Sequence, residues 1–410
     1  MEVEIGRGKK ARRAYGFDDI AIVPSRRTRD PDDIDITWTL GPYRFELPLL
    51  ASAMDGVVSP ETAGILGKLG GLGVLNLEGI WTRYEDPDAE LERIAGYPKD
   101  LATSEMQRIY AEPVQEELIA QRIREIKEYG VVAAASLTPQ RVRSYYETAI
   151  DAGLDILVIQ GTVISAEHVS TRGEPLNLKE FIREVPLPVA VGGCASYSTG
   201  LHLMRTGAVG VLVGVGPGAA CTTRGVLGIG VPQATAIADV AAARSQHMLE
   251  TGEYVKVIAD GGMRNGGDVS KAIACGADAV MIGSPLARAY EAPGRGYHWG
   301  MATFHPSLPR GARVKTTQNG SLAQILMGPA HENDGTFNLV GSLRTSMATC
   351  GYEDIAAFHK AELMIAPALQ SEGKQLQREQ EVGMGATSAA RAHPDANGLA
   401  TPAPDPAFAE

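Results

Sequence analysis

A cysteine lies inside a glycine-rich loop, directly ahead of two threonines and an arginine, and this combination can form a nucleophile. The loop is the stretch Gly214–Arg224, and Cys221 follows three glycines and a proline that fall within five positions. Such a composition cannot continue a β-strand, because glycine adopts turn conformations and proline removes a hydrogen-bond donor. The hydroxyls of Thr222 and Thr223 and the guanidinium of Arg224 can favour the thiolate over the thiol. We therefore predict a loop nucleophile; the alternative is a buried structural cysteine, which is the commoner fate of a free thiol.

Two later apolar runs end in residues that could bind an anion and a diol. Asp260 is followed by Gly261 and Gly262, and Gly283 is followed by Ser284. Backbone N–H groups at such glycines can cradle a phosphate, and a carboxylate can accept two hydrogen bonds from a ribose diol. Taken singly, each of these motifs is more typical of an ordinary turn. Together with a nucleophile they predict a site for a nucleoside monophosphate.

These motifs are positioned by a regular alternation of short apolar runs and segments of helical periodicity, which is typical of β/α units in a parallel sheet. The eight runs are Leu47–Met54, Leu72–Asn76, Val131–Ser136, Ile156–Gly161, Pro188–Gly193, Val209–Gly214, Lys256–Gly261 and Ala279–Ser284. Eight strands close a (β/α)8 TIM barrel, in which the residues beyond the carboxyl ends of the strands share one face. Capping residues, prolines and glycines predict helices at Ser59–Gly70, Thr138–Gly153, Pro232–Gly252 and Asn265–Gly276.

The other segments are assigned to the same α/β domain, 1–366, or to a tail. Residues 1–46 are polar and rich in turns, and we expect them to cap one end of the barrel. Residues 77–130 are long enough for a short helical insertion of one or two extra helices, and 285–320 is predicted to be an active-site lid. The tail, 367–410, loses apolar periodicity and is predicted to be flexible and disordered.

Composition excludes several classes of function. The chain has 410 residues and a net charge of −11, which argues against nucleic acid as the main partner but not against a single phosphate. The basic residues in 7–13 could form a nucleic-acid arm, but we interpret them as a solvated terminal segment. No apolar run approaches the ~18 residues of a membrane span, and the N-terminus has no apolar signal region. The four cysteines lack disulfide or zinc spacing, so we expect a cytoplasmic protein without a membrane partner.

The quoted residues resemble those of the IMP dehydrogenase and GMP reductase family, in register across about residues 15–360. The resemblance is carried by Val213–Arg224, Gly230–Gln233, Ile258–Gly262, Gly283-Ser284 and Ser52–Asp55. The Gly-Pro-Gly-x-x-Cys-Thr-Thr-Arg loop is highly specific to this family. The resemblance implies a homotetramer or octamer of barrels, in which the cysteine attacks C2 of a purine monophosphate and a nicotinamide cofactor, NAD, exchanges the hydride.

Carried over position by position, the resemblance implies a role for each matching residue. Cys221 is the implied nucleophile, and Thr223 assists proton handling. Asp260 accepts the ribose diol, and Gln324 meets N1 and O6 of the purine. The other implied substrate contacts are Ser52, Met54, Gly261, Gly262, Gly283, Ser284, Gly300 and Met301. The implied cofactor contacts are Gln160, Gly161, Thr162 and Gly214, and a monovalent cation such as K⁺ could bind the backbone carbonyls of Gly216, Gly218 and Cys221.

The chain departs from the family pattern mainly around the cofactor. Gln160 replaces the usual aspartate, Cys194 replaces an asparagine, and Ala219 replaces a serine that would bind the phosphate. The dipeptide His298-Trp299 stands where a tyrosine is expected. Residues 77–130 occupy the place of the cystathionine-synthase-type regulatory pair, so we expect no allostery through such domains.

The lid also lacks the usual arginine–tyrosine pair that activates water, and we hypothesise that Arg310 or Arg313 serves instead. The resemblance then allows two opposite reactions. GMP reduction needs a carboxylic acid that protonates the leaving ammonia, whereas Gln324 cannot supply that proton. We therefore favour NAD-dependent oxidation of IMP to XMP in purine and GMP biosynthesis. The alternatives are an NADPH-dependent GMP reductase and a purine nucleotide sensor without catalysis.

Overall fold

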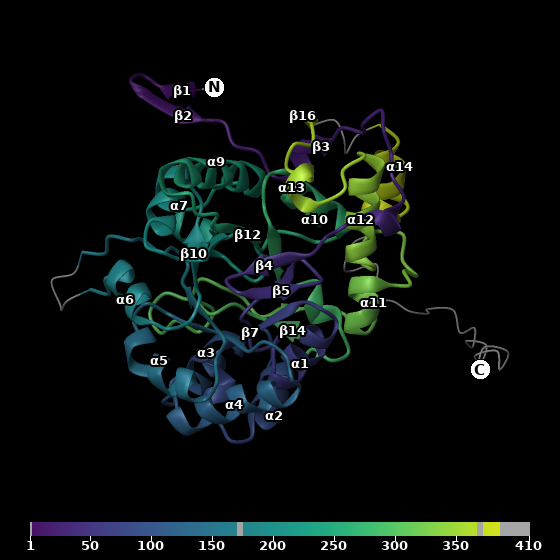
Figure 1. Cartoon of the computed structure of the whole chain (residues 1–410). Coiled ribbons are helices and arrows are strands. Elements are labelled where there is room, and N and C mark those ends of the chain that lie inside the picture. The colour runs from purple at the N-terminus through teal and green to yellow at the C-terminus, as the bar shows by residue number, and fades with distance from the viewer. Residues whose placement is uncertain (1, 170–174, 367–371, 386–410) are drawn as a thin grey trace, which may run out of the picture.

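Eight parallel strands close into a barrel at the centre of the molecule (Figure 1). The computed structural model describes residues 2–169, 175–366 and 372–385. The barrel strands are β6 (Leu49–Ala51), β7 (Leu72–Asn76), β8 (Ala134–Leu137), β9 (Ile156–Gln160), β10 (Val189–Cys194), β11 (Gly210–Val213), β12 (Lys256–Asp260) and β13 (Ala279–Ile282). Each pairs in parallel with its neighbours in chain order, and β13 pairs with β6. The predicted TIM barrel is thereby confirmed.

Helices surround the barrel and bury the outer face of its strands. They are α1 (Pro60–Lys68), α4 (Glu116–Glu128), α5 (Val142–Asp151), α6 (Leu178–Glu184), α7 (Tyr197–Met204), α9 (Gln233–Thr251), α10 (Gly266–Ala274) and α12 (Leu339–Thr349). Because helices cover one side of the strands and the barrel interior the other, the strands are apolar along their length. The helix ends follow local chemistry: Asn265 Oδ1 accepts from Asp268 N at 3.0 Å where α10 begins, and α9 ends at Gly252, whose φ is +78°.

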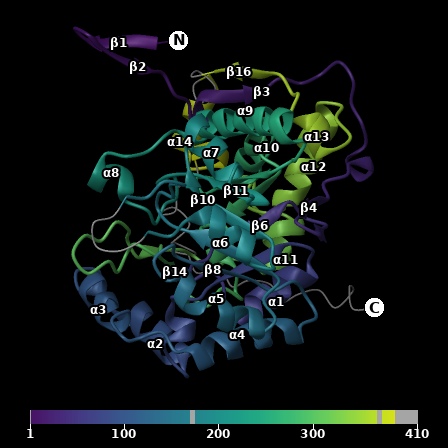
Figure 2. The ribbon, with the colours of Figure 1, turned by 60° about the vertical axis from the view of Figure 1, so that its left-hand side comes forward.

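The insertion between β7 and β8 contains two helices in addition to the regular barrel helix. Its second half forms α4, which packs between α1 and α5 and so belongs to the helical ring. The extra helices are α2 (Pro87–Gly96) and α3 (Ala102–Ile109). Figure 2 shows α3 at the edge of the barrel, beside the lid segment.

The N-terminal segment covers parts of the barrel and also projects from it. The hairpin β1 (Glu2–Gly6) and β2 (Lys9–Arg12) stands away from the body (Figures 1 and 2). Strand β3 (Ile20–Ile22) pairs with β16 (Leu363–Ile365). A second hairpin, β4 (Trp38–Leu40) and β5 (Tyr43–Phe45), buries Leu40 near the start of β11. This hairpin therefore caps the amino end of the barrel, opposite the carboxyl ends of its strands.

The lid and the region after it contain short elements. Within 285–320 the strands β14 (Tyr297–His298) and β15 (Val314–Lys315) form one antiparallel pair. Then follow α11 (Leu322–Met327), α12, α13 (Ile355–Phe358) and, in the predicted tail, α14 (Lys374–Glu379). Within that tail, residues 367–371 and 386–410 lie outside the described residues. In the described part of the chain, no helix combines the length and the hydrophobicity that a membrane span requires.

Candidate active site

A cavity of about 1150 Å³ lies at the carboxyl ends of the barrel strands. Its lining comes from the loops after six of the strands, as the barrel geometry predicts, and also from the lid and the N-terminal segment. It includes most of the site residues named from the sequence: Ser52, Met54, Gln160, Gly161, Thr162, Gly214, Gly216, Gly218, Cys221, Thr223, Asp260, Gly261, Gly262, Gly283, Ser284, Gly300, Met301 and Arg310. Motifs that lie far apart in the sequence therefore share one hollow.

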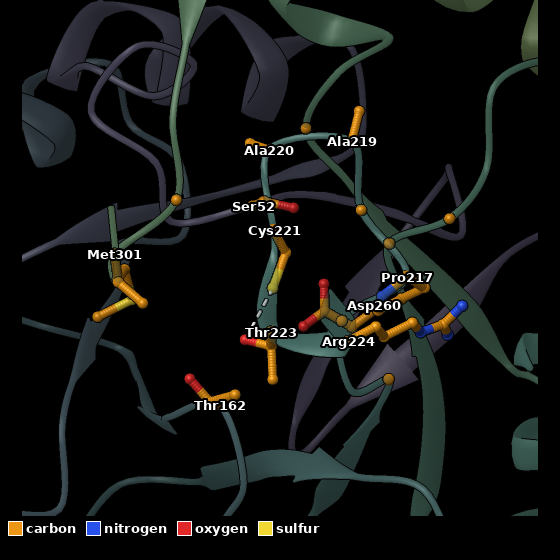
Figure 3. Close-up of a pocket in the computed structure, with 18 of the residues that line it drawn as sticks. Ser52, Thr162, Pro217, Ala219, Ala220, Cys221, Thr223, Arg224, Asp260 and Met301 are labelled. Atoms are coloured by element: carbon orange, nitrogen blue, oxygen red, sulfur yellow. Dashed lines mark hydrogen bonds between the residues drawn. The ribbon is translucent and has the colours of Figure 1, made fainter. Parts of the chain in front are cut away.

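Cys221 faces this cavity and is partly exposed, unlike the other three cysteines. Its Sγ–H donates to Thr223 Oγ1 at 3.2 Å, as the dashed line in Figure 3 marks. Thr223 is fully buried at the start of α8 (Thr223–Leu227), so its hydroxyl is held in place. By contrast, Cys194, Cys275 and Cys350 are buried, and burial raises the pKa of the first two thiols to about 12. The accessible thiol with a fixed hydroxyl partner is Cys221.

Arg224 stabilises the cysteine loop through hydrogen bonds to backbone carbonyls. Its Nε donates to Val215 O at 3.3 Å and its Nη2 to Val231 O at 2.8 Å. These bonds tie the start of the loop to the segment that precedes α9. Burial lowers the pKa of Arg224, and the Coulombic interaction with Cys221 opposes that decrease, so the charge of Arg224 acts on the sulfur as expected although its hydrogen bonds go to backbone carbonyls.

Asp260 forms the polar floor of the cavity at the end of β12. Gln160, at the end of β9, donates from Nε2 to Asp260 Oδ2 at 3.1 Å. Burial raises the pKa of Asp260 to about 7, and the hydrogen bond from Gln160 opposes that rise. Gln160 Oε1 is buried and has no hydrogen-bond partner among the described residues. The pair therefore offers a ligand one carboxylate and one unused amide oxygen.

The backbone after Asp260 is shaped for close approach by an anion. Gly261 and Gly262 have φ angles of +75° and +84°, which side chains with a Cβ rarely adopt. Gln233 Nε2 donates to Val213 O, Asp260 O and Gly261 O at 2.8, 3.0 and 3.2 Å. This one side chain fixes the ends of two neighbouring strands.

Ser284 is held by His298, which the sequence indicated only as a departure from the family pattern and not as a site residue. His298 Nε2 lies 2.8 Å from Ser284 Oγ, and His298 Nδ1 lies 2.7 Å from Thr316 Oγ1. His298 is almost completely buried, and burial lowers its pKa to about 4, so the ring is neutral at pH 7. The β14–β15 pair brings His298 and Thr316 together. Spacing along the chain gave no signal for this contact, because the strands are two residues long.

The lid contributes Gly300, Met301 and Arg310 to the cavity. In Figure 3 the Met301 side chain lies across the hollow from Asp260, with Cys221 between them. Arg310 O accepts from Thr222 N at 3.0 Å, so the lid is attached to the cysteine loop. Arg310 Nε is buried without a hydrogen-bond partner in the described part of the chain.

Two predicted site residues lie elsewhere. Arg313 donates from Nη1 to Ile94 O and from Nη2 to Tyr97 O at 2.7 Å, and its guanidinium stacks on Tyr297. Gln324 Oε1 accepts from Ser321 N at 2.9 Å in a capping box at the start of α11. Neither residue lines the cavity. In this structure, hydrogen bonds to the Arg313 guanidinium and to Gln324 Oε1 hold both side chains outside the cavity, which does not support the predicted catalytic role of Arg313 or the predicted substrate role of Gln324.

The cavity also includes residues that sequence reasoning passed over. Thr138, Pro139 and Gln140 follow β8, and Gly16, Phe17 and Asp18 come from the N-terminal segment. The first group directly follows a predicted strand, so the strand-end rule could have found it. The second group gave no such signal, since it precedes the barrel in the sequence.

Comparison with known proteins gives consistent matches along most of the chain. Residues 14–375 match the model of the IMP dehydrogenase / GMP reductase domain. An "uncharacterized oxidoreductase" of Mycolicibacterium smegmatis is 49% identical over 372 residues, which cover 88% of this chain and 99% of the relative. Inosine-5'-monophosphate dehydrogenase of Methanocaldococcus jannaschii is 27% identical, over 88% of this chain and 95% of the relative.

A solved structure has the same fold. The crystal structure of an IMP dehydrogenase/GMP reductase-like protein from Corynebacterium glutamicum superposes with a TM-score of 0.85 at 48% identity. The match covers 89% of this chain and 97% of that one.

Proposed function

The chain belongs to the IMP dehydrogenase/GMP reductase family of oxidoreductases, and from this premise we propose that it oxidises IMP to XMP with NAD⁺. The observation that carries the proposal is the Cys221 thiol, which faces a cavity shared with Asp260 and Ser284 and is bonded to the buried hydroxyl of Thr223. A thiol so placed suits covalent catalysis, which divides one difficult oxidation into two easier steps.

In the proposed reaction Cys221 acts as the thiolate, after its proton has passed to solvent through the hydroxyl of Thr223 to which the thiol is bonded. Sγ attacks C2 of the purine, the S–C2 bond forms, and the hydride leaves C2 with its electron pair; bound NAD⁺ would supply the hydride acceptor. Water then adds to C2 and loses one proton to solvent, the S–C2 bond breaks with its electron pair on sulfur, and the thiolate of Cys221 is regenerated with release of XMP. Arg310 is the proposed group that orients this water, since it lines the cavity and its Nε is unpaired among the described residues.

The remaining lining residues hold the substrate in this proposal. Asp260 accepts from the ribose diol, and Met54 and Met301 contact the base. The phosphate binds Ser284 and the backbone of Gly262 and Gly283, all of which line the cavity. Charged residues are few here, so backbone N–H groups supply most of the phosphate contacts.

The cavity suits a cofactor as well as a nucleotide. Its volume, about 1150 Å³, exceeds the ~300–1000 Å³ of typical small-molecule sites. Gln160 Oε1 lacks a partner within the described chain and can accept from a ribose hydroxyl of NAD, and Gly161, Thr162 and Gly214 lie beside it. A K⁺ ion on the carbonyls of Gly216, Gly218 and Cys221 stays a hypothesis, since carbonyl oxygens suit K⁺ but Gly218 O already accepts from Cys221 N. We also propose a cytoplasmic homotetramer or octamer, from the family alone.

The carboxyl groups in the cavity bear on whether the reaction is IMP oxidation or GMP reduction. Ammonia leaving from GMP needs a proton donor near the base. The carboxyl groups in the cavity lining are those of Asp18 and Asp260. Asp18 forms an ion pair with Arg264 at 2.6 Å, and Asp260 is assigned to the ribose. Because neither carboxyl group is assigned to the base in this proposal, we favour IMP oxidation over GMP reduction.

The test is a paired assay of the full chain. IMP with NAD⁺ is expected to give NADH and XMP, and Cys221→Ala is expected to abolish both products. Cys275→Ala, which removes a buried thiol outside the cavity, is the matched control and should keep the activity. NADPH-dependent conversion of GMP to IMP without IMP oxidation would support the reductase instead. Binding of IMP without either reaction would support a sensor.

A further inference from the structure

Three buried side chains form a hydrogen-bonded chain that the proposed chemistry does not use. Tyr110 Oη donates to Asp55 Oδ2 and accepts from Trp299 Nε1, the latter at 2.7 Å. The exposed fractions of Asp55, Tyr110 and Trp299 are 2%, 6% and 1%. Asp55 lies in the loop after β6, Tyr110 directly follows α3, and Trp299 belongs to the lid, so one phenol oxygen joins the barrel, the insertion and the lid.

Both ends of this chain adjoin the cavity. Asp55 directly follows Met54, and Trp299 directly precedes Gly300 and Met301. Met54, Gly300 and Met301 all line the cavity. A shift of Tyr110 would therefore move the backbone on two sides of the candidate substrate site.

The phenol is suited to this bridging role by its surroundings. Burial and the neighbouring Asp55 raise the pKa of Tyr110 well above that of a free tyrosine, so the hydroxyl keeps its proton and donates it. Asp55 Oδ2 also accepts from Ile80 N at 3.0 Å. Because Asp55 is buried, loss of the Tyr110 hydroxyl would remove a hydrogen bond that water cannot readily replace.

Further contacts join the same extra helices to the lid. The ring of Tyr110 stacks on that of Phe304, with centroids 3.4 Å apart and planes 6° from parallel. Gln107, on α3, donates from Nε2 to His305 O at 3.0 Å. Arg313 donates to the carbonyls of Ile94 and Tyr97, at the end of α2. The lid from Trp299 to Arg313 is thus supported by α2 and α3 at several points along its length.

We propose that Tyr110 is a positioning residue through which the helical insertion holds the lid over the active site. In this protein the segment 77–113 supports the lid through Tyr110. The Tyr110 hydroxyl is bonded to Asp55 on the barrel side and to Trp299 on the lid side. The effect on turnover rests on the proposed function, whereas the effect on the lid does not depend on it.

The first experiment measures the lid directly, without substrate. In Tyr110→Phe the ring remains and only the oxygen is lost. We expect several-fold faster amide hydrogen exchange in 299–313 and several-fold faster alkylation of Cys221 by iodoacetamide, because the lid is bonded to the cysteine loop. The matched control is Tyr254→Phe, which breaks a 2.7 Å bond to Asp278 at the amino end of the barrel. That variant should leave unchanged both the amide exchange rate in 299–313 and the alkylation rate of Cys221.

A second variant keeps the proposal testable if Tyr110→Phe folds poorly, and a double variant tests whether Tyr110 and Trp299 act through one bond. Gln107→Ala removes the hydrogen bond from the partly exposed Gln107 side chain to His305 O. It should raise the amide exchange rate in 299–313 to a smaller extent. Trp299→Phe added to Tyr110→Phe should have less effect than the sum of the single changes, since both break the same bond. If amide hydrogen exchange in 299–313 were as slow in both Tyr110→Phe and Gln107→Ala as in the wild type, the proposal would be overturned.

The activity measurement distinguishes positioning from general stability. In Tyr110→Phe we expect a tenfold lower kcat for IMP oxidation with a thermal midpoint equal to that of Tyr254→Phe. A lower thermal midpoint with unchanged lid exchange would indicate a purely structural role and would also overturn the proposal. If the wild-type protein did not oxidise IMP, the proposed function would fail, while lid exchange and alkylation would still decide the role of Tyr110.

Discussion

Cys221 and Gly311 face each other across an antiparallel bridge between the cysteine loop and the lid. Thr222 N donates to Arg310 O at 3.0 Å, and Ala312 N donates to Ala220 O at 2.9 Å. The sulfur itself lies 3.8 Å from Arg310 O. Because two backbone hydrogen bonds join these segments, the positions of the thiol and of the Arg310 side chain are set together.

This bridge predicts that Gly311→Ala impairs catalysis. A Cβ at Gly311 would lie 2.2 Å from Thr303 Oγ1 and 3.0 Å from Ala220 O, so the lid strand must shift. A displacement of ~1 Å in a catalytic group can cost ~10²-fold in rate, and we expect a loss of kcat of that order. The control is Gly225→Ala, on α8, where a Cβ meets nothing within 4 Å. Steady-state kinetics of the two variants checks the prediction, and equal kcat values would contradict it.

Thr223 is predicted to act through its hydroxyl. Thr223→Val keeps the shape of the side chain and removes the acceptor 3.2 Å from Cys221 Sγ, so kcat should fall about 10²-fold, the low end of proton-transfer effects. Thr223→Ser should recover most of the rate. Thr222→Val tests the other hydroxyl named from the sequence, and a smaller loss is expected because the bond from Cys221 Sγ goes to Thr223 and the side chain of Thr222 makes no capping hydrogen bond to α8. A Thr223→Val enzyme as fast as Thr222→Val would remove the hydroxyl from the mechanism.

The sequence predicted the barrel because each strand carries its own signal. Leu72–Asn76 matches β7 in both limits, and Ser59 and Asn265 are the N-caps of α1 and α10. These features depend on local composition, capping and periodicity, which one sequence displays. The strand-end rule then brought Cys221, Asp260 and Ser284 to one face without any knowledge of long-range contacts.

The lid could not be predicted in the same way, since its residues have no periodicity and take their positions from distant partners. Arg313 is held by carbonyls of Ile94 and Tyr97, and His298 is placed by Thr316 through a two-residue strand pair. Gln324 was assigned from a resemblance across variable sequence, whereas its side chain completes a local helix cap. Tertiary hydrogen bonds decide the positions of Arg313 and His298, and a local cap decides that of Gln324.

His298 is predicted to support phosphate binding through Ser284. His298→Phe removes the partner 2.8 Å from Ser284 Oγ, and loss of about one hydrogen bond should raise KM for IMP roughly tenfold. Inosine, which lacks the phosphate, should show no comparable change in KM. The comparison of the two substrates checks the assignment, and equal effects on both would place the role of His298 away from the phosphate.

Asp260 predicts a pH dependence of nucleotide binding. Burial raises its pKa to about 7 in the free protein, so the carboxylate takes up a proton as the pH falls through that value. The ribose hydroxyls donate to the ionised form, and KM for IMP should therefore rise about tenfold per pH unit below 7. Ionisation of the IMP phosphate is common to all variants. In Asp260→Asn KM should be high at every pH and should lose this part of the slope.

Gln160 provides the second half of this test. Its amide donates to Asp260 Oδ2 at 3.1 Å and so favours the carboxylate. In Gln160→Leu that hydrogen bond is lost, the pKa of Asp260 should rise further, and the onset of weak binding should move to higher pH.

The raised pKa of Asp260 also affects stability. The folded-state pKa lies above the unfolded value of 3.8, so the free energy of unfolding should decrease as the pH rises from about 4 to 7. Urea unfolding across this range should show a decrease in wild type that Asp260→Asn lacks, and identical slopes would contradict the assignment.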